Sequence, residues 1–155
     1  MSQNSTKPDK PGQVADAITG NWVDNFAPIK LRPYLRLSRA DRPIGTWLLL
    51  IPCWWGLLIG ILEDENVLAS DFWLLFSCSI GAFLMRGAGC TWNDILDRKI
   101  DGAVERTRSR PIPSGQVNLT QAIVWMIIQI GLAGTILLSY NLISIILGLS
   151  SLFLV

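Results

Sequence analysis

Four side chains that carry oxygen ligands fall within nine positions of this chain. They are Asn93, Asp94, Asp97 and Asp101. If the segment is helical, the three aspartates lie at positions i, i+3 and i+7, and the amide of Asn93 joins the same face. Carboxylates this close repel one another, and a hard cation such as Mg²⁺, which prefers oxygen ligands and often bridges to a phosphate, offsets that repulsion. The spacing therefore predicts a metal and phosphate site.

Arginines flank this acidic cluster on both sides. Arg86 lies seven positions before Asn93, on the same side of a continuous helix, and three more arginines follow the last aspartate at 106, 108 and 110. Guanidinium groups bind phosphate oxygens through paired hydrogen bonds, so these residues suit an anionic ligand. Two further candidates for that ligand stand just before the first apolar segment: Arg39 and Arg42.

Three interpretations of residues 86–115 compete. In the first, the charges only set the orientation of a membrane protein, which explains neither the one-sided spacing nor Arg86. In the second, the stretch belongs to a membrane enzyme in which carboxylate-bound Mg²⁺ draws electrons from a leaving diphosphate while arginines hold the diphosphate oxygens. In the third, the carboxylates form the cation site of an ion-coupled membrane carrier or channel. The spacing favours the enzyme.

The elements that must position these residues are long apolar segments. The chain has 155 residues, half of them hydrophobic, and a positive mean hydropathy of +0.40. Residues 43–62, 72–85 and 111–155 contain no charged side chain. A spanning helix needs about 20 apolar residues. The first segment therefore predicts one span, the second a span if it continues past Arg86 toward Trp92, and the third two, in an all-α, multi-span transmembrane helical bundle.

The distribution of charge predicts how these spans are oriented. All 13 basic residues lie before the first span or between Arg86 and Arg110, whereas the 63–71 connection carries only acids. By the positive-inside rule, the N-terminus and the 86–115 stretch face the cytoplasm. A lipid-facing helix that carries Arg86, Asp94, Asp97 and Asp101 would cost about 10 kcal/mol, so this charged face lies at the aqueous edge of the membrane or in a polar cavity. We predict a multi-pass protein of the bacterial inner membrane, with the lipid bilayer and no nucleic acid as partner.

Composition excludes several kinds of catalytic site. The chain has no histidine, which removes serine and cysteine triads and the usual zinc enzymes. Its three cysteines lack metal-ligand spacing and are predicted to be packing residues.

Residues 1–30 are polar and predict a flexible cytoplasmic tail, too rich in aspartate for a transit peptide. Residues 30–43 suit an amphipathic approach to the membrane surface.

Local signals predict where the later helices begin and end. Gly102 is expected to interrupt the helix that carries the acids, and the prolines at 111 and 113 preclude another regular helix before Asn118. Asn118 and Gln121 have the spacing of a capping box, so the next helix is predicted to start there and run to about Leu138. A turn over residues 139–141 then leads into a fourth span from residue 142.

Three linked motifs resemble one known family. The NDxxDxxxD pattern of residues 93–101 with the MRGAGCTWND stretch at 85–94, together with RADRPIGTWLLLIP at 39–52 and ERTRSRPIPSG at 105–115, resembles the UbiA superfamily of intramembrane prenyltransferases. Within it, the chain is most similar to the 4-hydroxybenzoate polyprenyltransferases. The resemblance covers about residues 34–155.

The resemblance implies a reaction and a ligand set. Such enzymes bind a polyprenyl diphosphate through Mg²⁺, ionise it and transfer the prenyl chain to 4-hydroxybenzoate, next to its hydroxyl, in ubiquinone biosynthesis. Prenylation of another aromatic or quinone precursor is the nearest alternative. Carried over by matching position, Asn93, Asp94, Asp97 and Asp101 would serve Mg²⁺ and diphosphate, the aspartates being catalytic. The candidates for binding diphosphate or the acceptor carboxylate are Arg39, Arg86, Arg106 and Arg110.

The chain departs from the family in length. Members are bundles of about nine spans with a second aspartate-rich motif in the latter half, whereas three spans and part of a fourth are predicted here. We therefore expect residues 31–155 to be the N-terminal part of a transmembrane prenyltransferase domain, truncated within its fourth span. The isolated fragment is expected to be inactive.

Overall fold

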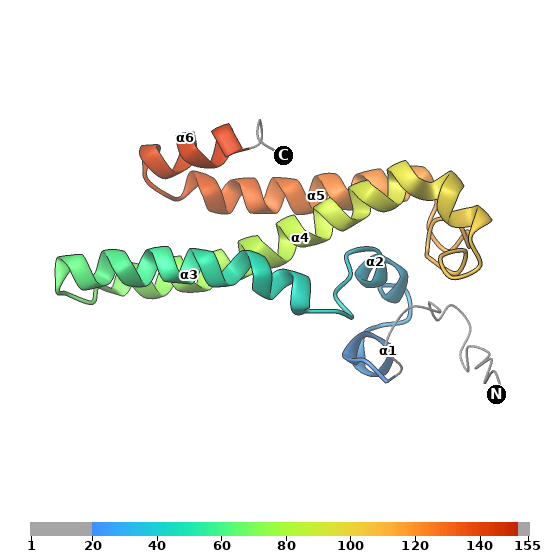
Figure 1. Ribbon diagram of the computed structural model, residues 1–155, viewed down its shortest axis with the longest axis horizontal. Helices are drawn as coiled ribbons and strands as arrows, with labels where there is room; N and C mark the ends of the chain where they lie inside the picture. Colours follow the sequence, from blue (N-terminus) through green and yellow to red (C-terminus); the bar gives the residue numbers. More distant parts are fainter. Residues whose placement is uncertain (1–19, 152–155) are drawn as a thin grey trace. The chain divides into compact units, whose positions relative to one another are not determined.

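The computed structural model describes residues 20–151, and its regular elements over that range are all helices. Figure 1 shows their order along the chain. The elements are α1 (Trp22–Phe26), α2 (Arg32–Leu37), α3 (Ile44–Asp64), α4 (Ala69–Ala103), α5 (Leu119–Leu138) and α6 (Leu142–Ser151). The predicted all-α class is confirmed.

Three of these helices are long and apolar enough to cross a membrane: α3 over Ile44–Glu63, α4 and α5. With 35 residues and a rise of about 1.5 Å each, α4 is about 52 Å long, which exceeds the hydrocarbon core of about 30 Å. About 20 residues suffice to cross that core. If α4 enters it near Ala69, its segment 93–101 emerges beyond the lipid tails, as the cost of burying charge requires.

The helix boundaries follow the local signals closely. The Asn118 side chain accepts a hydrogen bond from the Gln121 amide (2.8 Å), and the Gln121 side chain accepts one from the Asn118 amide (3.0 Å). This reciprocal capping box starts α5 where it was predicted, and α5 ends at Leu138. The other boundaries differ slightly, because α4 begins at Ala69 and ends at Ala103, one residue beyond Gly102.

The chain divides into two compact units, which are described separately. The first comprises the described residues up to Pro43 together with Gly87–Met126, and the second comprises Ile44–Arg86 together with residues 127–151. Each of α4 and α5 contributes one part to each unit.

A small apolar core holds the first unit together. Its buried members come from α2, α4, the loop before α5 and α5 itself: Leu37, Ile95, Val117 and Ala122. Tyr34 and Trp125 pack against this core with their ring centroids 5.4 Å apart. The indole nitrogen of Trp125 also donates a hydrogen bond to the Ser38 hydroxyl (2.8 Å). These contacts fix the end of α2 against the start of α5.

The prediction of a flexible tail over residues 1–30 is wrong for residues 21–27, while residues 1–19 lie outside the described range. Asn21 caps α1 by accepting a hydrogen bond from the Asp24 amide (3.0 Å), and Val23 is fully buried. The carboxylate of Asp24 pairs with Arg36 of α2 at 2.5 Å, both side chains being 7% exposed. Composition alone could not predict this folded segment, because the ion pair that holds it joins residues twelve positions apart.

Removing one partner of this buried ion pair should destabilise the first unit. We expect Asp24→Ala to lower the free energy of unfolding by about 3 kcal/mol, because it removes the Asp24 carboxylate from the buried Arg36 guanidinium. The double variant Asp24→Leu/Arg36→Met should recover much of that loss, since it removes both charges. Thermal unfolding in detergent measures both, with exposed Lys30→Ala as the control. Equal midpoints for Asp24→Ala and the control would contradict the prediction.

The second unit is tied together by a few polar contacts between apolar helices. The indole of Trp54 on α3 donates to the Leu75 carbonyl on α4 (3.3 Å). The hydroxyls of Ser77 and Tyr140 lie 2.7 Å apart, which joins α4 to the turn between α5 and α6. Helix α3 continues through Pro52 as a single element. The cysteines at 53, 78 and 90 are all free; Cys90 is buried, whereas Cys53 is exposed.

Candidate functional site

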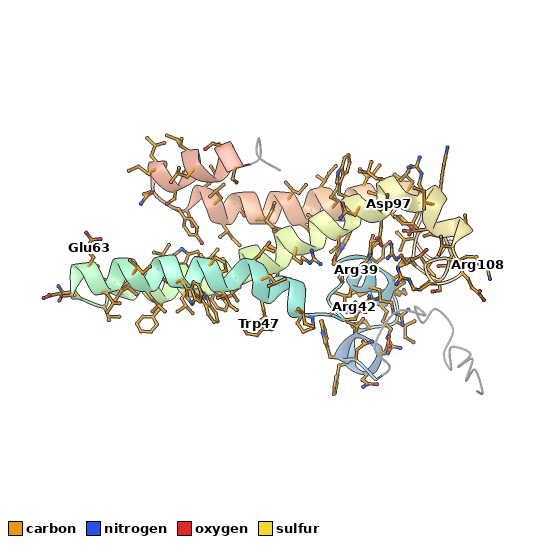
Figure 2. All side chains as sticks on the ribbon, viewed as in Figure 1. Arg39, Arg42, Trp47, Glu63, Asp97 and Arg108 are labelled. Atoms are coloured by element: carbon orange, nitrogen blue, oxygen red, sulfur yellow. The ribbon has the colours of Figure 1, made fainter. Side chains whose placement is uncertain are left out.

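The acidic segment is helical throughout, so the predicted spacing of its side chains is present on α4. Their burial differs, however. Asp94 is only 1% exposed and Asp101 is also buried, whereas Asn93 and Asp97 are exposed. Figure 2 shows Asp97 on α4 and Arg108 in the loop that follows it. The segment therefore has two buried carboxylates, both within the first unit, and two exposed oxygen-bearing side chains.

Arginines from two other segments neutralise the buried carboxylates. The Arg39 guanidinium, which follows α2, donates from Nη2 to Asp94 Oδ1 (2.9 Å). The Arg110 guanidinium donates from Nη1 to Asp101 Oδ2 (2.7 Å) and lies 3.4 Å from Asp94 Oδ1. The structure thus brings together four of the predicted site residues. The repulsion expected among the carboxylates is offset here by cations of the chain itself.

The backbone at the end of α2 positions Arg39. The Ala40 amide donates to the Leu35 carbonyl (2.9 Å), and the Arg39 amide donates to the Arg36 carbonyl (3.0 Å). This pair of bonds is a Schellman motif, whose left-handed position is usually occupied by glycine. Arg39 occupies it with φ of 55°, at a cost of about 1 kcal/mol relative to glycine. The strain at this position accompanies the contact between Arg39 and Asp94.

The loop between α4 and α5 positions Arg110. The Thr107 hydroxyl donates to the Asp101 carbonyl (3.0 Å), which ties the loop to the last turn of α4. The Val117 amide donates to the Pro111 carbonyl (3.0 Å), and both of these side chains are buried. Gly115 has φ of +75°, which fits the turn predicted at this glycine. The loop therefore folds back onto α4 instead of extending away.

Two buried carboxylate oxygens have no hydrogen-bond partner among the described residues: Asp94 Oδ2 and Asp41 Oδ1. Asp41 is buried, and its other oxygen accepts from Arg42 Nε at 3.2 Å. Sequence reasoning did not select Asp41, although it lies between Arg39 and Arg42 in the quoted motif. Unpaired buried oxygens are unusual in proteins and mark groups that can take a further ligand.

The remaining predicted residues are not part of this ion-pair network. Arg106 and Arg108 are exposed, and within residues 20–151 neither pairs with an aspartate. Arg86 belongs to the second unit, where its guanidinium lies against Gly45 at the start of α3. A Cβ at Gly45 would come within 2.6 Å of the Arg86 Cζ, so a larger residue there would displace the guanidinium. The Nε of Arg86 is buried and has no hydrogen-bond partner in the described chain.

The residues of α4 fit a magnesium ion by ligand type but do not form a closed cage. Over the described part of the chain, no three Asp, Glu, Cys or His side chains gather closely enough to hold a metal. Mg²⁺ needs no such cage, since it is commonly bound by one or two carboxylates, water and substrate phosphates. The unpaired oxygen of Asp94 and the exposed oxygens of Asn93 and Asp97 meet that requirement.

The fold and this site define a helical membrane protein with an aspartate–arginine cluster beyond the apolar part of one long helix. The chain belongs to the UbiA prenyltransferase family, which it matches over residues 49–155. It is 49% identical over 139 residues to the mitochondrial 4-hydroxybenzoate polyprenyltransferase of Rattus norvegicus, an alignment that covers 90% of this chain and 36% of the relative. The corresponding protein of Homo sapiens is 44% identical over 148 residues, with 96% and 39% covered.

The chain spans little more than a third of the length of these relatives. The protein of Bos taurus gives the same picture, with 50% identity over 90% of this chain and 37% of its own length. No solved structure matches the chain.

Proposed function

We propose that this chain forms part of an enzyme that transfers a polyprenyl group from polyprenyl diphosphate to 4-hydroxybenzoate, next to the hydroxyl, in ubiquinone biosynthesis. The observation that carries the proposal is the buried carboxylate of Asp94, which two arginines from distant segments share. Such a cluster suits a ligand that brings both a cation and an anion. Relatives about half identical to this chain are named as 4-hydroxybenzoate polyprenyltransferases.

Magnesium is the proposed cofactor, held by Asn93, Asp94, Asp97 and Asp101. When bound, it would supply charge that stabilises the departing diphosphate. The chain's own cations add to this effect. In the proposed complex, Arg39 and Arg110 exchange their carboxylate partners for diphosphate oxygens, because a guanidinium binds both kinds of oxygen in the same geometry.

Arg86 and Arg106 are the remaining proposed ligands of the diphosphate or of the acceptor carboxylate. Arg86 supports the first part of this proposal through its unpaired, buried Nε, which can donate a further hydrogen bond. Arg106 is exposed on the loop after α4. The apolar helices would exclude water, which protects an allylic cation from hydrolysis.

The proposed location is an inner membrane, with the N-terminus and the 86–115 stretch on the side that carries the basic residues. The relatives are named as mitochondrial proteins, so a mitochondrial inner membrane fits the proposal as well as a bacterial one.

Removing the metal should stop the proposed reaction. In membranes that contain the full-length protein, transfer of a labelled prenyl group to 4-hydroxybenzoate should fall by at least about 100-fold when a chelator removes Mg²⁺, and added Mg²⁺ should restore it. Scintillation counting of the extracted product measures the rate, with heat-treated membranes as the blank. Full transfer in the presence of chelator would contradict the metal's role.

Membranes that contain the full-length protein also distinguish two alternative functions. An ion-coupled carrier predicts that Asp97→Asn abolishes ion-dependent uptake into vesicles while no prenylated product forms. An enzyme for another phenol or quinone precursor predicts prenyl transfer to that acceptor and none to 4-hydroxybenzoate. Presenting the acceptors in parallel assays therefore separates the two from the main proposal.

A further inference from the structure

Large apolar side chains are exposed on α1 and in the segment that joins it to α2. Phe26 is 85% exposed and Ile29 is 79% exposed, although both are within the first unit and outside the long apolar helices. We call the following four residues, all at least 44% exposed, the N-terminal apolar patch: Trp22, Phe26, Ile29 and Leu31. Clustered exposure of this kind marks a surface that contacts something other than water.

The exposed face is not the face by which α1 packs. Val23, Asp24 and Ala27 are the buried residues of this segment, and Val23 and Ala27 pack with Ala40 in a second small core. Trp22 and Phe26 stand one helical turn apart, beside the buried face and not within it. The segment therefore has apolar side chains on both faces, and only one face is covered by the first unit.

Rigid contacts hold the patch in place. The ion pair between Asp24 and Arg36 joins α1 to α2, and the Trp22 indole donates to the Ala40 carbonyl (2.8 Å). Arg32 adds a hydrogen bond from Nε to the Ala27 carbonyl (2.9 Å). Phe26 and Ile29 are thus exposed on a segment that is itself folded.

The charges around the patch are suited to an anionic surface. Between residues 20 and 43, the two acidic residues, Asp24 and Asp41, are both buried, whereas Lys30 is exposed between Ile29 and Leu31. The next element along the chain, α3, is a candidate membrane span that begins at Ile44. In the sequence, the last residue of the patch, Leu31, lies 13 positions before the start of this span.

We propose that the N-terminal apolar patch inserts into the headgroup region of an anionic lipid leaflet. Phe26 and Ile29 enter the boundary between headgroups and acyl chains, and Lys30 stays among the lipid phosphates. The amphipathic Trp22 ring suits the same depth. Because α1 is fixed to α2, this insertion would hold the segment that carries Arg39 at the membrane surface. The inference does not depend on the chemistry of the site.

Depth-dependent fluorescence quenching tests this insertion. The full-length protein, with its native cysteines replaced, receives a single cysteine through Phe26→Cys or Ile29→Cys, labelled with an environment-sensitive dye. Asn25→Cys is the matched control, because Asn25 is the exposed polar neighbour of Phe26 on the same helix. Each variant is placed in nanodiscs of phosphatidylcholine, with or without phosphatidylglycerol, that contain a lipid bearing a nitroxide near the headgroup.

We expect the lipid nitroxide to quench the dye at 26 and 29 at least about twofold more than at 25, and more strongly in the anionic discs. Dye at 26 and 29 as accessible to a water-soluble quencher as at 25 would overturn the proposal. Dye that is shielded from both quenchers would overturn it too, because a protein surface would then cover the patch. Equal quenching in the two lipid mixtures would overturn its anionic preference.

Discussion

Replacing Asp94 with asparagine should lower prenyl transfer by at least about 100-fold and should also destabilise the first unit. The substitution keeps the side-chain volume but removes the charge that Arg39 and Arg110 share. Breaking a buried ion pair costs 3–5 kcal/mol, and the lower value of about 3 kcal/mol applies here because both arginines keep some solvent exposure and Arg110 retains Asp101. Transfer assays on membranes and thermal unfolding in detergent measure the two effects.

Asp97→Asn is the matched control for this prediction. Asp97 is exposed on the same helix, and no ion pair to it occurs among the described residues. Its replacement should change the free energy of unfolding by less than about 0.5 kcal/mol while still reducing transfer. Wild-type transfer by either variant would remove that residue from the proposed catalytic set. An Asp94→Asn protein as stable as Asp97→Asn would show that the buried ion pairs contribute nothing to folding.

Arg39→Gly should separate the role of the Arg39 charge from the conformation of its backbone. Glycine adopts the left-handed conformation of this position freely, so it relieves about 1 kcal/mol of strain, whereas Arg39→Ala removes the same charge and keeps the strain. We expect the glycine variant to be more stable than the alanine variant by about 1 kcal/mol. Both should lose at least about tenfold in transfer, since neither has a guanidinium for the diphosphate.

The order of stability is the informative measurement in this comparison. At most positions glycine is the less stable of the two residues, because it loses more backbone entropy on folding. Thermal unfolding of the two variants side by side in one detergent compares them. An alanine variant that equals or exceeds the glycine variant in stability would mean that residue 39 does not adopt the left-handed conformation in solution.

Much of the fold follows from the sequence, because its determinants are local. The charge-free segments predicted the apolar helices, and the Asn118–Gln121 capping box predicted the start of α5 within one residue. Both signals act over neighbouring residues, which share a helix and need no knowledge of tertiary packing. The order of residues 21–27 was missed for the converse reason, since it depends on the pairing of Asp24 with Arg36.

The site was predictable in its residues but not in its arrangement. Spacing placed the acids on one helix, yet spacing cannot distinguish the buried Asp94 from the exposed Asp97 three positions later. That distinction comes from Arg39, which is 55 positions away, and from a loop that folds back to deliver Arg110. Asp41 was not predicted as a site residue, because the sequence alone does not distinguish a single carboxylate between two arginines from an ordinary surface charge.

The sharing of Asp94 between two guanidinium groups also bears on the order in which ligands can bind. Asp94 and Asp101 carry two negative charges, and Arg39 and Arg110 carry two positive ones, so these four side chains are together electrically neutral. A bare divalent ion gains little attraction from this neutral set and is left with the unpaired oxygen of Asp94 and the exposed Asp97. A metal–diphosphate complex gains more, because its anion also binds the two arginines. In the proposed enzyme, the two ligands would therefore arrive as one complex.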